Sequence, residues 1–528
     1  MHFVSVRRDH GLVAVGSALI ALAFAAVLAF AARAQAAETI YWDNYSANTV
    51  AMADITGSGG GALNLTGATL ESPEGMAYDT VTNRLFVGSE GGPSGEGQII
   101  FINLDGSGAG TLNTGSAPVV SPEGVALDPA TRIIYWVNTG SSDTIGWANI
   151  DTGTGGLLNT TGATIVNPYR LALDPVGHRV YWSNEGTPQT IGYANADNSG
   201  GGGLLNTSGA PAPAGITGFA ADPAGGRLYW LDNSNEKVGF ASLAPGGNGG
   251  EVNLAGATFG KDNIFNNPYG LAFDPSIGRV YWGNYDQRIP VTTTPNLNAI
   301  GYVNLAGGVG GISPVSAPVN GPQDPVIIKS PSGTGVPTIT RSTATPAALS
   351  CSTGSWAADY PGSFVYQAPR TYAYQWLLNG APISGATAST LTAATQGSYT
   401  CTVTAANQSG SAGQTSAAVT VKAAKVKLTV KPKTAKAKAG KTATFNVKAL
   451  NQGDLTTKSA RVCVKVPNKA KKFLKAKCKS IGKIAALRAK TAKLKVKVEP
   501  EAVGSYKVKI QIKGGSGKAV KATIKVVG

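Results

Sequence analysis

Apolar and polar residues alternate in short segments along most of this chain, and Gly, Asn and Asp residues separate the segments. A period of two over roughly four to eight residues is typical of half-buried β-strands joined by tight turns. Whole phrases recur as well, as in "RVYWSN" (179–184) and "RVYWGN" (279–284). Because recurrence indicates repeated architecture, the pattern predicts an all-β protein that is built in part from repeats.

Six residue pairs mark the repeats, at spacings of 44, 50, 46, 48 and 52 residues. The pairs are Tyr41-Trp42, Leu85-Phe86, Tyr135-Trp136, Tyr181-Trp182, Tyr229-Trp230 and Tyr281-Trp282. A marker such as "PEGVALDP" (122–129) precedes five of the pairs, and a marker such as "TIGYANAD" (190–197) follows. Each repeat therefore has room for three or four short strands, which is the size of a β-propeller blade.

The two ends of the repeat region complement each other. The first pair has no marker before it, whereas "GPQDPVIIKSP" (321–331) is a marker with no pair after it. Together they complete one blade, in which the C-terminal segment supplies one strand and residues 39–71 supply the rest. Joining the ends removes exposed sheet edges. We therefore predict a closed six-bladed β-propeller over residues 38–333.

The repeats resemble the YWTD (LDL-receptor class B) propellers in "P-x-G-x-A-x-D…R-x-Y-W" followed by "I-x-x-A-x-x-D", over about residues 39–331. The chain departs from that family at the fourth motif position, where the family has Asp. The residues here are Asn44, Gly88, Asn138, Asn184, Asp232 and Asn284. Blade contacts that the family makes with a carboxylate would be made by an amide, so the resemblance does not imply receptor-type ligand chemistry.

Residues 336–422 have a different signature. Cys351, Trp376 and Cys401 stand at equal gaps of 25 residues, and Tyr399 precedes the second Cys by two positions. This spacing is typical of an immunoglobulin-like (Ig-like) sandwich with its core Trp and tyrosine corner. It resembles the bacterial Ig-like domains of surface proteins. With export, it predicts a Cys351–Cys401 disulfide.

Residues 424–528 alternate Lys with apolar residues, as in "KLKVKVEP" (493–500). Such a pattern predicts half-buried strands with a charged outer face. "AGKTATFNVKALNQGD" (439–454) resembles CARDB-type (cell-adhesion-related) Ig-like modules of bacterial envelope proteins. We expect Cys463 to pair with Cys478. The predicted fold class is thus all-β: a six-bladed β-propeller followed by two Ig-like β-sandwiches.

The N-terminus has the pattern of an export signal. Arg7 and Arg8 precede an uncharged run that reaches Ala32, and the small residues Ala34 and Ala36 follow. These features predict a signal peptide over residues 1–37. The run is long enough to span a bilayer, so an uncleaved anchor is the alternative. Either interpretation places the rest of the chain outside the cytoplasmic membrane, secreted or at the cell surface.

Histidine is nearly absent, which limits the chemistry available. Of the three His residues, His2 and His10 lie in the predicted leader, and His178 is left alone. Ser-His-Asp or Cys-His catalysis and multi-His metal sites are therefore poorly supported. We predict no catalytic residue, no metal ligand and no cofactor.

One set of polar residues could form a ligand site on the propeller. They occupy or adjoin the second position of each blade marker. The set is Glu74, Glu123, Tyr169, Arg170, Thr217, Tyr269, Gln323 and Asp324. If the blades superpose, these residues cluster near one mouth of the central channel, where converging polar groups can bind a ligand. The expected ligand is an unknown protein or glycan, and a solvated rim without a ligand is the alternative.

The net charge of +16 belongs to the C-terminal region. Residues 422–528 contain 30 Lys and Arg against three Asp and Glu, whereas residues 1–421 contain 15 against 26. The excess predicts contact with an anionic cell-wall polymer, an acidic glycan or lipid headgroups; solubility and edge protection are the alternative. The candidate contacts are Lys471, Lys472, Lys475 and Lys477, expected in an exposed loop. Interleaved aromatics are missing, which argues against specific nucleic-acid binding.

Three functions are compatible with these features. The first is an exported surface or adhesion protein that presents a propeller on Ig-like modules. The second is a propeller enzyme of lactonase or lyase type, for which Glu74 and Glu123 are the candidate acid/base pair at the channel mouth. The third is a structural envelope component without a discrete ligand.

Overall fold

The computed structural model describes residues 38–92, 96–140, 143–254, 267–285, 298–306 and 310–528, and the predicted leader lies outside these ranges. Two compact units are present. The first, which we call the propeller unit, contains the chain up to Ser332 together with residues 357–371 and 405–412. The second unit contains residues 333–356, 372–404 and 413–528. Within the described ranges, no helix is long and apolar enough to cross a membrane.

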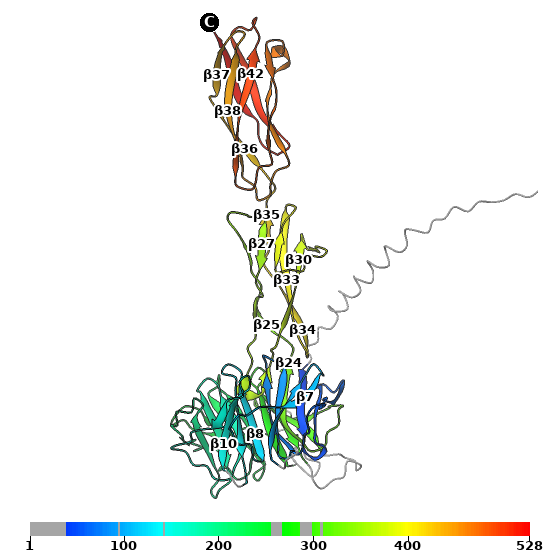
Figure 1. Cartoon of the computed structure of the whole chain (residues 1–528), viewed down its shortest axis with the longest axis vertical. Coiled ribbons are helices and arrows are strands. Elements are labelled where there is room, and N and C mark those ends of the chain that lie inside the picture. The colour runs from blue at the N-terminus through cyan, green and yellow to red at the C-terminus, as the bar shows by residue number, and fades with distance from the viewer. Residues whose placement is uncertain (1–37, 93–95, 141–142, 255–266, 286–297, 307–309) are drawn as a thin grey trace, which may run out of the picture. The chain divides into compact units, whose positions relative to one another are not determined.

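Six sheets, each with four blade strands, make up the body of the propeller unit (Figure 1). The innermost strands are β4 (Pro73–Asp79), β8 (Pro122–Asp128), β12 (Pro168–Asp174), β16 (Ile216–Asp222), β20 (Pro268–Asp274) and β24 (Pro322–Lys329). The second strands are β1 (Glu38–Asn44), β5 (Arg84–Ser89), β9 (Ile133–Asn138), β13 (Arg179–Asn184), β17 (Arg227–Asp232) and β21 (Arg279–Asn284). The third strands are β2 (Thr49–Asp54), β6 (Gln98–Asn103), β10 (Thr144–Asn149), β14 (Thr190–Asn195), β18 (Lys237–Ser242) and β22 (Ala299–Asn304). The outermost are β3 (Gly60–Ala62), β7 (Gly108–Thr111), β11 (Gly155–Leu157), β15 (Gly203–Leu204), β19 (Gly250–Glu251) and β23 (Gly311–Ser313). The predicted six-bladed propeller is confirmed.

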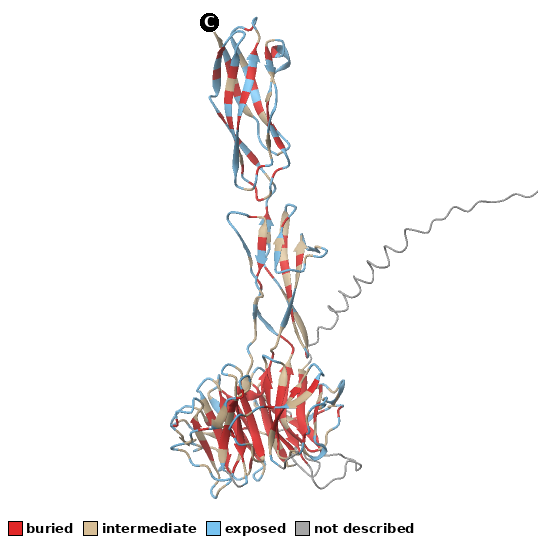
Figure 2. Ribbon diagram, in the orientation of Figure 1, coloured by how far each residue is buried: buried red, intermediate tan, exposed pale blue. Residues whose placement is uncertain are grey.

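The repeated Trp residues are fully buried, and Trp136 and Trp182 pack against residues of the neighbouring blade. The inner strands around them are mostly buried (Figure 2). Trp136 lies directly across the sheet from Gly146 of the third strand. A Cβ atom at Gly146 would lie 2.3 Å from the indole ring, so only Gly leaves room for it. The same Trp–Gly pair recurs in other blades. It is formed by Trp182 with Gly192, Trp230 with Gly239, and Trp282 with Gly301.

The amide at the fourth motif position holds the strand ends together. The Trp136 indole N–H donates to Asn138 Oδ1 at 3.0 Å, and this oxygen also accepts from the Val120 backbone N–H at 2.9 Å. The Asn138 Nδ2 group donates to Thr144 Oγ1 on the next strand at 3.1 Å. A carboxylate could accept the first two bonds but could not donate the third. The amide at this position thus has a structural use.

The shared blade forms as expected. Strand β1 pairs antiparallel with β24, which places Glu38 opposite Lys329 and Asp43 opposite Gln323. Strand β24 also contacts β4 of the following blade, so the ring of inner strands is closed. The Lys329 ammonium group lies 3.0 Å from Glu38, and it also bonds the Asp274 carboxylate. The predicted closure by the two ends of the repeat region is confirmed.

A short segment from later in the chain lies inside the propeller unit. We call residues 357–371 the plug; it contains the 3-10 turn η2 (Pro361–Ser363) and strand β29 (Val365–Tyr366). Strand β29 pairs in parallel with Ile327 and Ile328 of β24, on the side of that strand that faces the channel. The sequence pattern assigned these residues to the first sandwich. The pairing of these residues with β24 could not be inferred from the sequence, because a strand of two residues is too short to show an alternation of apolar and polar positions.

The plug closes the end of the channel at which the inner strands terminate. The Ser363 hydroxyl donates to the Ala221 carbonyl near the end of β16. Tyr366 is buried and packs edge-on against Tyr78 near the end of β4, with ring centroids 5.0 Å apart. Residues 405–412 are a second later segment that belongs to the propeller unit. Within it, Ser409 Oγ donates to the Ile328 carbonyl at 2.6 Å.

The second unit contains two groups of sheets. The first group, around Trp376, comprises β25 (Gly333–Gly335), β26 (Ile339–Arg341), β27 (Ala348–Cys351), β28 (Ser355–Trp356), β30 (Thr371–Leu378), β31 (Ala381–Pro382), β32 (Thr390–Thr392), β33 (Gly397–Asn407), β34 (Gly410–Thr415) and β35 (Val419–Val421). Trp376 is fully buried beside a Cys351–Cys401 disulfide. The Tyr399 hydroxyl donates to the Thr395 carbonyl at 2.8 Å, as in a tyrosine corner.

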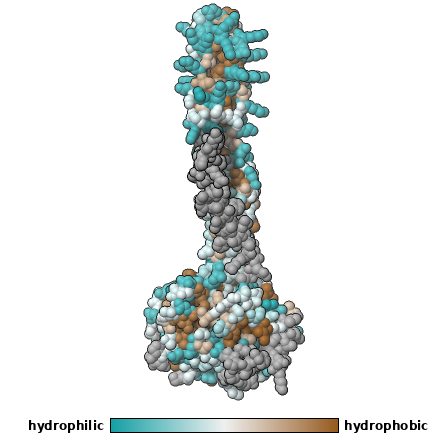
Figure 3. Space-filling model, turned by 90° about the vertical axis from the view of Figure 1, so that its right-hand side faces the viewer, coloured by the Kyte–Doolittle hydropathy of each residue, from teal (hydrophilic) through white to brown (hydrophobic). Residues whose placement is uncertain are grey.

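The second group forms a sandwich that we call the basic sandwich. One sheet has the order β36 (Val426–Lys431), β38 (Thr442–Asn451), β42 (Ala489–Val498) and β40 (Leu474–Ala476). The other has the order β37 (Thr434–Lys438), β44 (Val520–Val527), β43 (Ser505–Lys513), β39 (Ala460–Lys465) and β41 (Lys479–Gly482). Buried and exposed residues alternate along these strands, with Lys outward (Figures 2 and 3). A disulfide joins Cys463 to Cys478, so both predicted bridges are confirmed.

The plug yields a prediction about stability. Replacing Tyr366, which is 1% exposed, with Ala should lower the free energy of unfolding of the propeller unit by about 3 kcal/mol, because the change leaves a cavity beside Tyr78. Tyr372→Ala, at a position that is 39% exposed, is the matched control and should change it by less than about 1 kcal/mol. Denaturant unfolding followed by Trp fluorescence measures both. Equal losses would contradict the role given to the plug.

Candidate functional site

The eight predicted site residues come together at the beginning of the inner strands. Glu74 and Glu123 are the second residues of β4 and β8, and Tyr169 and Arg170 follow on β12. The other four are Thr217, Tyr269, Gln323 and Asp324, on β16, β20 and β24. This channel mouth, which we call the polar mouth, is at the opposite end of the inner strands from the plug.

Arg170 is the centre of the cluster, and its side chain is only 2% exposed. Its guanidinium lies 3.1 Å from the Glu74 carboxylate and 3.3 Å from the Asp324 carboxylate. Its Nε and Nη2 groups also donate to the Thr217 carbonyl at 3.1 Å, Gln323 Oε1 at 2.9 Å and the Tyr169 hydroxyl at 3.2 Å. The guanidinium bonds are thus directed into the protein, as a buried charge requires.

Glu74 and Glu123 form an acid pair beside Arg170. Both carboxyl groups are buried, and the negative charge of Glu74 disfavours ionisation of Glu123. Two buried carboxyl groups that repel each other in this way do not both ionise readily, so one proton stays with the pair. Burial raises the pKa of Glu123 strongly, and the neighbouring Glu74 charge raises it further. Burial also raises the pKa of Glu74, although the Arg170 charge opposes this shift. We therefore assign the shared proton to Glu123.

Asp43 is a fifth ionisable group of this cluster, and sequence reasoning missed it. Its carboxylate is fully buried, and neither oxygen has a hydrogen bond of normal geometry. Burial and the Asp324 charge raise its pKa well above the ordinary range, and Arg170 opposes the shift. A sequence signal existed: the residue after each repeat pair is apolar or Ser elsewhere. The equivalent residues are Val87, Val137, Ser183, Leu231 and Gly283.

Most of the predicted site lies deeper than the sequence pattern suggested. Tyr169, Tyr269 and Asp324 are half-buried, whereas the other five residues are buried. Above them, the ring of Tyr285 packs edge-on against those of Tyr45 and Tyr269, with centroids 5.8 and 5.9 Å away. Three tyrosine rings thus pack together at this mouth, with Tyr285 buried between the half-buried Tyr45 and Tyr269. We call Tyr45, Tyr169, Tyr269 and Tyr285 the tyrosine lip.

The channel behind the polar mouth is filled. A cavity of about 10 Å³ separates Arg170 from Phe364 of the plug, which is room for about one water molecule. Gly75 and Gly124 line it, and at both positions a Cβ atom would lie 2.5 Å from the backbone of the next inner strand. Ligand access is therefore limited to the polar mouth. Among the described residues, no group of His, Cys, Asp and Glu is arranged to hold a metal ion.

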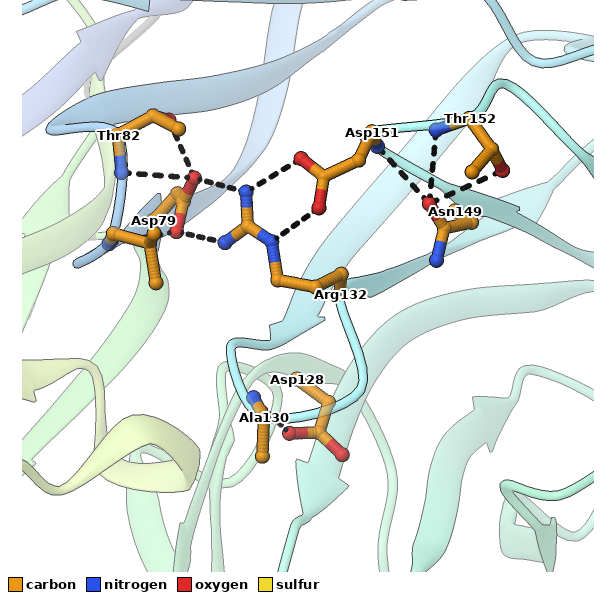
Figure 4. A network of polar contacts seen from close by, with 9 residues as sticks. Asp79, Thr82, Asp128, Ala130, Arg132, Asn149, Asp151 and Thr152 are labelled. Atoms are coloured by element: carbon orange, nitrogen blue, oxygen red, sulfur yellow. Dashed lines mark hydrogen bonds and ion pairs between the residues drawn. The ribbon is translucent and has the colours of Figure 1, made fainter.

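The opposite end of the channel is held by turn-forming Asp residues and an ion-pair bridge (Figure 4). The Val81 backbone N–H donates to Asp79 Oδ1 at 2.9 Å, and the Ala130 backbone N–H donates to Asp128 Oδ1 at the same distance. Arg132 bonds Asp79 of the preceding blade and lies 2.8 Å from Asp151. Burial opposes ionisation of Asp79, yet hydrogen bonds from Arg132 and Thr82 hold its pKa below the ordinary value. Asp79 and Asp128 thus organise turns, and Asp79 also joins two blades.

The predicted polyanion contacts lie on the basic sandwich and are all exposed. Lys471 and Lys472 follow the 3-10 turn η3 (Asn468–Ala470), and the Lys472 ammonium lies 4.7 Å from the centre of the Phe473 ring. Lys475 differs from expectation, since it belongs to strand β40 and stands opposite Lys497. Lys477 lies between that strand and Cys478.

Comparisons with known proteins add little beyond the fold. No family model and no curated protein matches the chain. A putative TolB from Agrobacterium tumefaciens has a TM-score of 0.35 at 13% identity, over 56% of this chain and 98% of its own. A gluconolactonase from Xanthomonas campestris has the same score and identity, over 60% and 94%. A putative 6-phosphogluconolactonase from Bacteroides uniformis has a TM-score of 0.34 at 13% identity, over 56% and 100%. Likenesses this weak carry no argument about function.

The acid pair yields a prediction about pH. The folded-state pKa of Glu123 is raised above the unfolded-state value of about 4.3. The protonated carboxyl group therefore makes its full contribution to folding stability below that pH. This contribution is lost as the pH rises through the folded-state pKa. The melting temperature should therefore fall from about pH 5 to pH 8. Glu123→Gln, which stays neutral, should reduce this fall. Glu96→Gln at an exposed position is the control, and an unchanged slope in Glu123→Gln would contradict the shared proton.

Proposed function

We propose that this chain is an exported surface or adhesion protein that binds other molecules and catalyses no reaction. In this proposal, the basic sandwich contacts anionic polymers of the cell envelope, and the polar mouth of the propeller takes a second ligand, a protein or a glycan. The observation that carries it is the unbalanced charge of residues 422–528. These residues include 30 cationic and three acidic side chains. The region is fully described, and the ion pair formed within it joins Lys497 to Glu499.

Other features support parts of the proposal. Two disulfides and the lack of a free Cys fit an oxidising compartment outside the cytoplasm. The Tyr-Trp pairs at equivalent positions of the second strands support the resemblance to YWTD repeats. The tyrosine corner supports an Ig-like first sandwich, and the alternating Lys strands support a CARDB-type second one. The tyrosine lip supports a glycan or protein ligand, because Tyr rings offer an apolar face beside a polar hydroxyl.

Salt dependence tests the polyanion contact. Exposed Lys charges are screened over about 8 Å at physiological ionic strength. Binding of residues 38–528 to an immobilised anionic wall polymer should therefore weaken at least about tenfold between 50 and 200 mM salt. Replacing Lys471, Lys472, Lys475 and Lys477 with Gln should weaken it severalfold without changing the melting temperature. Absence of binding at low salt would favour the structural envelope component.

A second candidate function rests on the Glu74–Glu123 pair. Two carboxyl groups that share a proton at a channel mouth can act as general acid and base, which a lactonase or lyase would need. If the pair is catalytic, purified protein should hydrolyse small lactones, and Glu123→Gln should lower kcat at least about 100-fold. Glu96→Gln should leave the rate unchanged. Activity that survives in Glu123→Gln would eliminate this candidate.

A further inference from the structure

A groove of about 580 Å³ lies on the outer face of the sheet that contains β37, β44, β43 and β39. Its charged lining consists of lysines only. They are Lys433, Lys465, Lys507, Lys509 and Lys521. The remaining lining residues are small or uncharged, and none carries an aromatic ring. We call this surface the lysine groove.

Three of these lysines stand directly opposite one another. The strand register pairs Lys465 with Lys509, and Lys509 with Lys521, so one row across β39, β43 and β44 is entirely cationic. Lys436 and Lys525 are paired in the same way at the next strand boundary. Like charges placed directly opposite in a sheet are destabilising. Folding alone therefore gives no reason for this arrangement.

The other sheet of the basic sandwich has no such row of three lysines. There, Lys493 stands opposite Asn446, and Lys495 stands opposite Thr444. Its Lys–Lys pair, Lys475 with Lys497, has the Glu499 carboxylate 3.2 Å from the Lys497 ammonium. This fold can thus carry outward Lys residues without aligning them in a row of mutually repelling charges. Solubility alone does not explain the row in the lysine groove.

The groove charges are not neutralised within the protein. Of the three acidic residues in 422–528, Asp454 pairs with Arg341 and Glu499 pairs with Lys497. The ion pairs formed by the described residues include no groove lysine. An external anion is therefore the available partner for this row.

The chemistry of the lining selects the ligand class. Lys binds phosphate as a point charge, and Arg, which supplies planar bidentate recognition of carboxylate and phosphate groups, is missing from the lining. The lining therefore favours a ligand by its charge density and not by the geometry of a single anionic group. The missing aromatic rings leave no platform for base stacking. Neighbouring strands lie about 4.8 Å apart, and residues two apart on a strand about 7 Å, so the ammonium groups emerge from a dense grid. Such an array of ammonium groups suits an extended polymer whose negative charges are closely spaced.

We propose that the lysine groove binds one extended phosphate-bearing polymer, with Lys465, Lys509 and Lys521 as the central contacts. The proposal rests on the polyanion binding proposed above and assigns it to a site. The ligand neutralises the repulsion along the row and so stabilises the sandwich when it binds.

Two double variants with the same charge change test the assignment in the full chain of residues 38–528. Lys509→Gln with Lys521→Gln removes two charges from the row, and Lys493→Gln with Lys495→Gln removes two from the other sheet. The probe is long-chain inorganic polyphosphate, and orthophosphate is the monomer control. We expect the groove variant to bind polyphosphate at least about tenfold more weakly and the control variant less than about twofold.

Two further measurements distinguish binding in the lysine groove from general electrostatic attraction to the basic sandwich. The slope of log affinity against log salt should fall by about 1.4 in the groove variant, which is 0.7 for each of two lost contacts. Without ligand, the groove variant should melt at a slightly higher temperature, because repulsion along the row is relieved. A groove variant that melts lower and binds less would show a folding defect, and it would overturn the proposal.

The outcomes distinguish this proposal from the proposed function. If the unaltered chain binds neither polyphosphate nor the immobilised wall polymer, both fail. If it binds the wall polymer but no polyphosphate, the groove proposal is overturned and the proposed function stands. If it binds polyphosphate and the two double variants lose affinity equally, the groove assignment is overturned while general polyanion binding stands. Stronger binding to vesicles of anionic lipid than to polyphosphate at equal phosphate concentration would replace the polymer with a membrane surface.

Discussion

The pairing of β1 with β24 is the constraint on which the propeller depends. Twisted four-stranded sheets arranged around an axis leave open edges unless the first and last strands meet. Here the meeting strands come from opposite ends of the repeat region, and the register places Asp43 opposite Gln323. The same pairing therefore closes the ring and brings Asp43 to the cluster around Arg170. One strand pairing thus both closes the ring and adds a residue to the polar mouth.

The two ends of the channel use opposite physical solutions. At the polar mouth, carboxyl groups crowd around one guanidinium, and protonation of Glu123 relieves part of the excess negative charge. At the other end, residues 357–371 add β29 to the free channel-facing side of β24 and cover the inner strands. Because the propeller unit includes this later segment, its core is completed only after the chain has left the last blade.

The basic sandwich separates stability from surface charge. Its core is made of small and branched apolar residues such as Val447 and Ile510, which are buried on one face of each strand. The other face is free to carry Lys without affecting that core. The two sheets use this freedom differently, since a row of three aligned lysines crosses the sheet of the lysine groove, and the other sheet has no such row. A ligand-dependent function explains that difference better than solubility does.

The sequence by itself determined the blades, the closure, both disulfides and the candidate mouth residues. These depend on local periods and on repeated positions, which superpose when identical units pack around an axis. Tertiary structure decided three things that no period encodes. The plug pairs over two residues, and Asp43 enters the cluster through strand register. The Lys465–Lys509–Lys521 row arises from the alignment of β39 with the consecutive strands β43 and β44. Each depends on which strands become neighbours, and neighbours are chosen only when the whole chain folds.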